Sequence, residues 1–528
     1  MIKPGVMMNE STDKRFYIKP GIVLSLVFII ASLYSVSHHE MWRDELQAWM
    51  IAISSNSISE LFANIKYEGH PPLWFIILYA LKHLTQNPAA MQVVHVIIAA
   101  ISVFVFARYA PFTITERILF VFGYFVFYEY NIISRNYAVG VLLLFCFLSI
   151  HKERILENNY VVLAIILFLL CRANVFATVL AVTCASYSAI TLFQQRADWI
   201  TSPKKRTEII FSAVVFLGGL ITALRVMSPE PDISLYAPLH LPANFEELVA
   251  DTTAIVSSLW SAYMPLPRFE TVFWESNAIS YLPLKPFERY MIRFVISLAV
   301  FIIITAAFMR KPRVLFFYLF SSCFVFFFYF VVVFRVRYIG HLYLIFIASM
   351  WLWRGNTLSH DFRNTYMHKF SVFSEKILMR YILIIILIVN FAAGVSANVM
   401  DIVMPFSSSS EAAAFIKNDP RTANLPIAGS IDYIVSPIAG YLNRPVYYLD
   451  SGRLGTFIIW DKKRKIWTPE DLTDIVKKEK KDLVLVTSYP LQRDLMEFLH
   501  ISELRSFPRG AAYDEVYWIY MVAYISGG

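Results

Sequence analysis

The first 400 residues consist largely of apolar stretches that are long enough to enter or cross a lipid bilayer. A spanning helix needs roughly 17 to 25 mostly apolar residues. With 57% apolar residues, 16% aromatic residues and a mean hydropathy of +0.55, the chain lies outside the range of soluble proteins. The sequence predicts a polytopic α-helical membrane protein with about 11 or 12 transmembrane or re-entrant helices, several of them short. The candidate stretches are 21–37, 71–86, 92–108, 117–133, 137–150, 160–172, 175–193, 208–226, 291–309, 314–334, 339–353 and 380–400.

Basic residues between these stretches indicate the orientation of the chain, because loops rich in lysine and arginine stay in the cytoplasm. We therefore interpret the net charge of +8 as an orientation signal and predict no nucleic-acid partner. The N-terminal tail 1–20 is predicted to be cytoplasmic, and the first stretch is retained because no small-residue cleavage site follows it. The basic loops contain Lys14 and Arg15, Lys152 and Arg154, Lys204 to Arg206, Arg310 to Arg313, and residues 354–380.

The alternate loops then face outward, and the chemistry is expected on that side. Twelve complete crossings would return the C-terminus to the cytoplasm, whereas the basic loops place it outside. One of the three segments between 71 and 133 is therefore expected not to cross fully. The predicted outward segments are 38–70, 134–137, 227–290, 334–341 and everything after residue 401.

The tail 401–528 differs in composition from the membrane region 21–400 and predicts a small extracytoplasmic α/β domain. The serines at 407–410 suggest a linker and helix cap, and Thr468 with Pro469 marks the start of a helix. No glycine-rich phosphate loop is present, so a nucleotide role is not indicated. The strand candidates are 425–430, 445–450, 456–460, 482–488 and 515–524.

Charged side chains gather in the first two outward loops. Asp44 and Glu45 follow the first apolar stretch, and "YEGHPPLW" places His70 at the entrance to the next. The outward turn "SRNYA" carries Arg135 and Tyr137. An isolated carboxylate there would be an interface charge, and Arg135 could simply pair with Glu129 or Asp44. An arginine between apolar helices needs an anionic partner, however, and such residues are usually functional.

This set of groups suits transfer of a sugar from a lipid-linked phosphate. Cations at the bilayer surface would hold the phosphate, and a carboxylate would take the proton of an attacking hydroxyl. Arginine contacts that tighten as the phosphate departs would lower the barrier.

The Asp-Glu pair, the HPPL motif at 70–73 and the Arg-x-Tyr-Ala turn at 135–138 are similar, in this order, to the GT-C glycosyltransferases. The groups concerned are protein O-mannosyltransferases, lipid A aminoarabinose transferases and dodecaprenyl-phosphate galacturonic acid transferases. The resemblance covers roughly the first 150 residues. It implies a GT-C fold and an inverting transferase at the outer face of a bacterial inner membrane. The donor would be a polyprenyl-phosphate sugar and the acceptor a lipid, glycan or protein.

The resemblance also implies roles for individual residues. Asp44 would be the general base, and Glu45 would orient Asp44 or the acceptor. His70 and Arg135 would contact the donor phosphate, and we add Tyr137 to this group. Arg43 is not expected from the resemblance, and it could neutralise the carboxylates and lower the pKa of Asp44.

Later stretches supply weaker candidates. "FRVRYIGH" places Arg337 and His341 at an outward helix end, where they would bind phosphate or lipid head groups. Lys285 and Arg268 of the long loop would gate the acceptor entrance. His38 and His39 are adjacent and do not form a metal-ligand set. The basic run 461–465 is interpreted as a solvated loop.

Two other classes remain open at this point. A transporter or flippase of lipid-linked sugars would share the helices, although no repeated halves are visible. A membrane enzyme of the O-antigen polymerase or ligase type would use arginines of a long outer loop such as 227–290. The sugar, acceptor, carrier length and oligomeric state are not determined. No cofactor is expected, although Asp44 with Glu45 leaves a divalent cation open.

Overall fold

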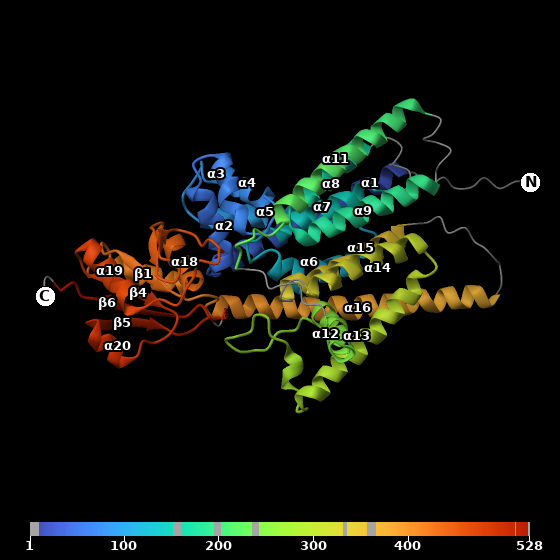
Figure 1. Cartoon of the computed structure of the whole chain (residues 1–528). Coiled ribbons are helices and arrows are strands. Elements are labelled where there is room, and N and C mark those ends of the chain that lie inside the picture. The colour runs from blue at the N-terminus through green and yellow to red at the C-terminus, as the bar shows by residue number, and fades with distance from the viewer. Residues whose placement is uncertain are drawn as a thin grey trace, which may run out of the picture.

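The computed structural model describes residues 10–151, 160–194, 202–234, 242–330, 335–355, 366–512 and 514–525. Long helices form an elongated bundle, and a domain containing a β-sheet caps one end of it (Figure 1). We call this the capped end. The predicted class, a polytopic helical membrane protein with a small C-terminal α/β domain, is confirmed. The predicted basic loop at Lys152 and Arg154 lies outside the described residues, as do residues 1–9 of the predicted tail.

Six described helices are long and apolar enough to cross a membrane. Four shorter helices are also apolar. In α1 (Glu10–Val36), the apolar part begins at Pro20. The six are α5 (Ala89–Tyr109), α9 (Val175–Gln194), α11 (Pro203–Met227), α13 (Pro286–Phe308), α15 (Val336–Gly355) and α16 (Tyr366–Val403). The shorter ones are α1 (Glu10–Val36), α7 (Tyr137–Ile150), α8 (Tyr160–Cys171) and α14 (Pro312–Phe327).

The structure shows which early segment does not cross. Helix α4 (Leu73–Leu81) has nine residues, and at 1.5 Å per residue it spans about 13 Å, less than half of a hydrocarbon core. Lys82 at its end contacts the backbone of Ile53 at 3.4 Å, which holds α4 beside α2 (Arg43–Ser54) at the capped end. Segment 71–86 is therefore too short to cross a bilayer and stays at the capped end.

The segment between α5 and α7 does run the length of the bundle, although it is not one helix. It is divided into α6 (Ile114–Val121) and the π-helical turn η2 (Tyr124–Glu129). Glu116 at its start pairs with Arg354 at 2.7 Å, at the end of α15 remote from the cap. Together with the ten helices above, this segment gives an odd number of apolar segments along the described bundle, which is the parity that the basic loops require.

The five outward segments predicted from the basic loops meet at the capped end. The first loop contacts the turn 134–137 through Asp44 and Arg135, and it contacts α15 through Arg337, 3.4 Å from Asp44. The long loop reaches it through Trp274, whose ring centroid lies 4.7 Å from that of Trp42. Parts of these segments thus lie together at one end of the bundle, as segments on one side of a membrane would.

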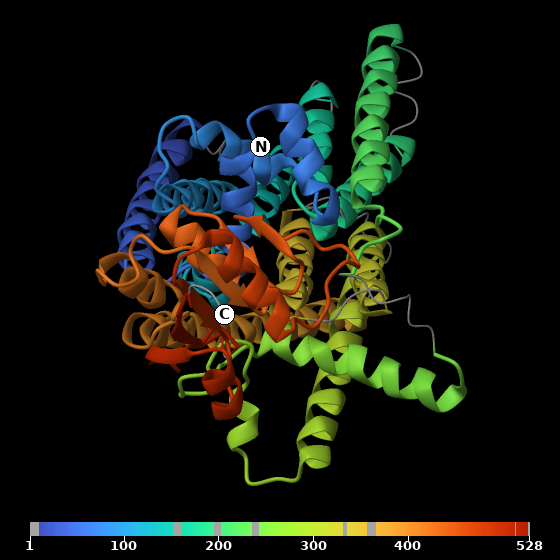
Figure 2. The same ribbon diagram turned by 60° about the vertical axis from the view of Figure 1, so that its left-hand side comes forward.

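A six-stranded sheet in the order β3-β2-β1-β4-β6-β5 forms the centre of the C-terminal domain (Figure 2). Strands β2, β1 and β4 are parallel, and antiparallel strands flank them on both sides. Four of the five predicted strands are present, as is the helix after Thr468, whereas β3 and β5 were not predicted. The elements are α17 (Ser409–Asn418), β1 (Ile427–Ser430), α18 (Asp432–Leu442), β2 (Val446–Tyr448), β3 (Arg453–Gly455), α19 (Pro469–Glu479), β4 (Leu483–Thr487), α20 (Arg493–Phe498), β5 (Ile501–Phe507) and β6 (Tyr517–Val522).

Both faces of this sheet are covered, which explains why its central strands are apolar throughout. Alternate residues of a strand point to opposite faces. Val484 and Val486 of β4 pack with α17 and α18, whereas Leu483 and Leu485 pack with α19. A strand buried on both sides has no polar face to expose.

The predicted strand 456–460 was wrong, because this segment bonds to the membrane part instead of the sheet. Gln47 of α2 donates to the Ile458 carbonyl at 2.8 Å and accepts its N–H at 2.9 Å. This reciprocal pair satisfies the backbone groups that a sheet would otherwise satisfy. Gly440 of α18 also lies against Leu46, where an added Cβ would be 3.2 Å from that side chain. The domain is thus docked directly on α2.

The position of α4 is testable by cysteine labelling. In a variant whose four cysteines are replaced by alanine, Leu84→Cys should react with a membrane-impermeant maleimide added on the same side as Ile466→Cys. Leu84 follows α4 and is 83% exposed, and Ile466 of the C-terminal domain is 88% exposed. Met309→Cys, at the opposite end of the bundle, is the control that should react only after permeabilisation. Labelling of Leu84→Cys together with Met309→Cys would contradict the topology.

Candidate active site at the capped end

Three consecutive charged residues open α2, and the helix directs them to three different places. Successive side chains of an α-helix diverge by about 100°. Arg43 reaches Asp514 of the C-terminal domain at 2.8 Å, Asp44 faces a cavity, and Glu45 is completely buried. Two carboxylates in the first turn also interact favourably with the positive end of the helix dipole. The motif therefore combines one domain contact, one acid that lines a cavity and one fully buried acid.

Asp44 is held by arginines from two other segments. It pairs with Arg135 of the outward turn and lies 3.4 Å from Arg337 of α15. Burial alone would raise the pKa of Asp44, but the charges of Arg135, Arg337 and Arg43 outweigh it and hold the pKa below the usual value. Asp44 is therefore ionised at neutral pH. Arg135 pairs with Asp44 rather than Glu129, which accepts from Trp274 instead.

These groups line one cavity of about 230 Å³ between the bundle and the C-terminal domain. Four of the residues predicted from sequence meet there: Asp44, His70, Arg135 and Arg337. The complete lining is Arg43, Asp44, Gln47, Glu68, His70, Arg135, Arg337, Tyr338, Tyr433, Ser436, Ile458 and Trp460.

A second cavity of about 250 Å³ adjoins the first, and the two share Arg43 and Arg337. Trp42 lies between these arginines, whose guanidinium carbons are 5.2 Å and 5.4 Å from its ring centroid. Arg268 lines this second cavity together with Trp274, Glu275 and Arg335. The long loop thus contributes to the site through Arg268, as predicted for one of its two basic candidates.

One wall of the first cavity carries a neutral histidine and a carboxyl that is only partly ionised at neutral pH. Burial and the charge of Asp44 raise the pKa of Glu68 to about 7, against a hydrogen bond from Gln47 at 2.8 Å. Burial and the charge of Arg135 lower the pKa of His70 to about 3, so His70 is neutral. His70 Nδ1 is buried without a hydrogen-bond partner. This histidine would meet a phosphate as a neutral donor rather than as a cation.

Four predicted residues lie elsewhere. Tyr137 is 2% exposed and packs against Arg135, and it does not line the cavity. His341 is buried and stacks on Phe176 at 4.5 Å, because the α15 helix turns it into the bundle. Lys285 is the exposed N-cap residue of α13, and Glu45 is buried behind Asp44.

The C-terminal domain supplies site residues that the sequence did not reveal. Tyr433 and Trp460 line the cavity with ring centroids 5.9 Å apart, and Arg464 lies 5.1 Å from both rings. Arg464 also pairs with the buried Asp432. It was assigned to a solvated basic loop, and this assignment was wrong for Arg464 because aromatic contacts remove it from solvent. No local pattern marks such residues, since they are some 400 positions from Asp44.

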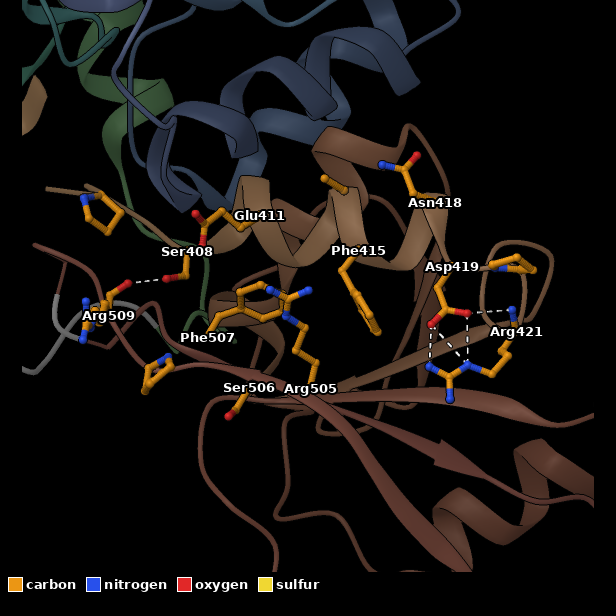
Figure 3. Close-up of a pocket in the computed structure, with 14 residues that line it drawn as sticks. Ser408, Glu411, Phe415, Asn418, Asp419, Arg421, Arg505, Ser506, Phe507 and Arg509 are labelled. Carbon is orange, nitrogen blue, oxygen red and sulfur yellow. Dashed lines mark hydrogen bonds and ion pairs between the residues drawn. The ribbon is translucent and has the colours of Figure 1, made fainter. Parts of the chain in front are cut away.

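A wider groove of about 950 Å³ lies in the C-terminal domain between α17 and β5 (Figure 3). Arg505 and Phe415 line it from the two elements, and Arg421 pairs with Asp419 at 2.6 Å at one end. None of the residues predicted for the site lines this groove. The chemistry is therefore sought in the cavities at α2.

No sequence model of a known protein family matches the chain, and no curated relative was found. The chain is similar to solved structures that include two of ArnT. ArnT from Cupriavidus metallidurans bound to undecaprenyl phosphate has a TM-score of 0.49 at 13% identity, over 96% of this chain and 98% of that chain. The apo state of the same protein has a TM-score of 0.47 at 13% identity, over 95% and 97%. At 13% identity and TM-scores below 0.5, these likenesses do not identify the reaction of this chain.

The raised pKa of Glu68 predicts a pH-dependent effect of Glu68→Gln on stability. A carboxyl whose folded pKa exceeds its unfolded value favours the folded state at low pH, and this contribution is lost as pH rises through the folded pKa, here about 7. The difference in melting temperature, variant minus wild type, should therefore increase by about 2 °C between pH 5.5 and pH 8.5. Thermal unfolding in detergent measures this difference. Burial also raises the pKa of Glu515 to about 7. The melting temperatures of both proteins therefore keep a dependence on pH that comes from Glu515. A constant difference across this range would contradict the assignment.

Proposed function

We propose that this protein is a membrane glycosyltransferase that moves a sugar from a polyprenyl-phosphate donor to an acceptor at the outer face of a bacterial inner membrane. The observation that supports it is a single ionised carboxylate, Asp44, held between Arg135 and Arg337 on the wall of a cavity at the capped end. A carboxylate and paired cations are the two kinds of group that this transfer needs. The acceptor is proposed to be a lipid, glycan or protein.

In the proposed reaction, an acceptor hydroxyl attacks the anomeric carbon of the sugar from the side opposite the phosphate. Asp44 takes the hydroxyl proton as the new carbon–oxygen bond forms. The bond between the anomeric carbon and the phosphate oxygen breaks, and the polyprenyl phosphate leaves with the electron pair. One inversion at the anomeric carbon results. Arg135 and Arg337 stabilise the negative charge that develops on the departing phosphate.

The same arginines explain how a carboxylate with a lowered pKa becomes a useful base. In the unliganded protein their charges hold the Asp44 pKa down and make it a weak base. A donor phosphate that enters the cavity competes with Asp44 for Arg135 and Arg337. As the arginines move to the phosphate, the basicity of Asp44 rises in the presence of substrate.

We further propose that the transfer requires no metal ion. Asp44 and Glu45 are not available as a pair, because both Glu45 oxygens are already engaged inside the protein. Oε1 accepts the Ser134 N–H at 2.6 Å, and Oε2 lies 3.1 Å from His39 Nε2. The positive charge at the phosphate is then supplied by arginines, whose forked N–H groups match phosphate oxygens.

Asp44→Asn should abolish transfer, since the amide keeps the shape of the side chain but does not accept a proton. A general base contributes about 10²- to 10⁴-fold, so a loss within that range is expected. Wild-type and variant proteins would be incubated with a panel of radiolabelled undecaprenyl-phosphate sugars, and release of label from the lipid would be followed. Normal turnover by the variant would exclude Asp44 as the base. If no donor is consumed while a lipid-linked sugar crosses proteoliposomes, the transporter interpretation replaces this one.

Arg135→Ala should lower kcat by about 10²- to 10³-fold, the effect of removing one preorganised donor to a developing anion. The matched control is Arg421→Ala, which removes an exposed arginine paired with Asp419 at the groove of Figure 3. The control should turn over at the wild-type rate. Equal activity of Arg135→Ala and the control would contradict a role for Arg135 at the phosphate.

Transfer should continue at an undiminished rate after dialysis against EDTA, because arginines supply the charge. The rate in EDTA with and without added Mg²⁺ or Mn²⁺ measures this directly. A rate that disappears in EDTA and returns with either ion would overturn the metal-free proposal.

A further inference from the structure

A chain of buried polar groups lies directly behind Asp44, on the side away from the cavity. Glu45 is fully buried, and its Oε2 accepts the N–H of Trp42 at 3.2 Å in addition to facing His39 Nε2 at 3.1 Å. The other ring nitrogen of His39 lies 2.8 Å from Asp401 Oδ2. Asp401 is 3% exposed and belongs to the last turn of α16. These groups connect α2 with the helix that leads into the C-terminal domain.

Two contacts join the neighbouring residues Asp44 and Glu45 to the neighbouring residues Ser134 and Arg135. Asp44 pairs with the side chain of Arg135, and Glu45 Oε1 accepts the backbone N–H of Ser134 at 2.6 Å. Residues 44 and 45 thus face residues 134 and 135 in a closed ring of contacts. The second contact fixes the distance between the two backbones that carry the acid and its arginine. His95 adds a third restraint, because its Nε2 lies 2.7 Å from the Arg135 carbonyl.

His39 is suited to hold Glu45 in this orientation. Both of its ring nitrogens face carboxylate oxygens, which only accept, so both contacts are satisfied when the imidazole carries two protons. Burial lowers the pKa of His39, but the charges of Asp401 and Glu45 more than offset this and hold the pKa well above the ordinary value. The ring is packed on Phe406 at 4.7 Å. Glu45 therefore has a charged, rigid partner.

We propose that Glu45, His39 and Asp401 form a positioning relay for the transfer reaction, which holds the turn of Arg135 at the spacing that Asp44 requires. This inference rests on the proposed function. None of the three residues lines either cavity at α2, so they are positioning residues and not catalytic ones. The relay also explains why the acidic pair is Asp-Glu: the shorter acid faces the cavity and the longer one reaches the opposite backbone.

Glu45→Gln and Asp401→Asn test the relay at its two ends. Each variant keeps the side-chain shape and removes the charge that holds His39. A misalignment of an ångström or less lowers the reaction rate by up to about 100-fold. We therefore expect kcat to fall by about 10- to 100-fold, whereas the KM for the donor should change much less. Because the relay joins Asp401 to the turn through His39 and Glu45, the double variant should be no slower than the slower single variant. Independent, multiplicative losses would overturn the relay.

The Arg135→Ala background separates positioning from general destabilisation. If Glu45 acts by placing Arg135, then Glu45→Gln should change the residual rate by no more than about twofold once Arg135 is absent, the usual limit of additivity errors. If Glu45 merely supports the fold, the full loss should reappear in that background. The latter result would contradict the proposal.

Hydrogen exchange provides a readout that does not depend on activity. In Glu45→Gln and in Asp401→Asn, amides of residues 131–138 should exchange faster than in the wild type. The first variant replaces the carboxylate that accepts the Ser134 N–H, and the second removes the partner through which His39 holds that carboxylate. The matched control is Glu116→Gln, the same substitution at a carboxylate that is 1% exposed and pairs with Arg354 at the opposite end of the bundle. Its 131–138 peptide should exchange at the wild-type rate. Unchanged exchange in both relay variants would overturn the inference, whatever the reaction.

The two proposals fail in distinguishable ways. If the wild type consumes no donor but exchange at 131–138 rises in the relay variants, the proposed function fails and the restraint on the turn is supported. If the wild type transfers sugar and the relay variants match it in kcat, the relay fails and the proposed function stands. Asp401→Asn lies two contacts from Glu45, so it serves where Glu45→Gln does not fold.

Discussion

The contact of Asp44 with Arg135 and Arg337 is the interaction on which the capped end depends. Each of these charges comes from a different part of the chain, and each would be costly beside a membrane without the others. Their mutual attraction brings the first loop, an outward turn and the start of α15 to one point. The arginines leave the cavity lined with both charge signs, which the proposed transfer reaction requires.

The C-terminal domain is part of this site rather than an appendage to it. Gln47 is paired in both directions with Ile458, and Arg43 with Asp514 ties the same helix to the end of the chain. These contacts place Tyr433 and Trp460 over the cavity that Asp44 faces. Their aromatic rings form part of the wall of the cavity that also contains the carboxylate. The membrane part alone would present the acid to open solvent.

The sequence was informative wherever a local rule applied. The bilayer sets the length of apolar stretches, so the membrane class followed from composition, and basic loops identified the segments that share a side. Arg135 was singled out because ionisable residues between apolar stretches are usually functional, and His70 because it opens the HPPL motif; both line the cavity. Tyr137 was added beside Arg135 and His341 was taken from an outward basic run, and neither lines the cavity, since local sequence does not say toward which neighbour a helix turns a side chain. The segment 456–460 has strand-like composition, but Gln47 offered its backbone another partner.

The sequence by itself determined the kind of molecule, its outward loops and the presence of an acid beside arginines. These depend on hydropathy, charge and short-range order, which are properties of neighbouring residues. Only the tertiary structure decided that α4 does not cross and that Asp44 and Glu45 have opposite environments. It also decided that His39 joins Glu45 to Asp401, a contact between residues 362 positions apart. Such contacts depend on how distant helices pack, because burial changes what a charged side chain must bind, and no local pattern of residues contains that information.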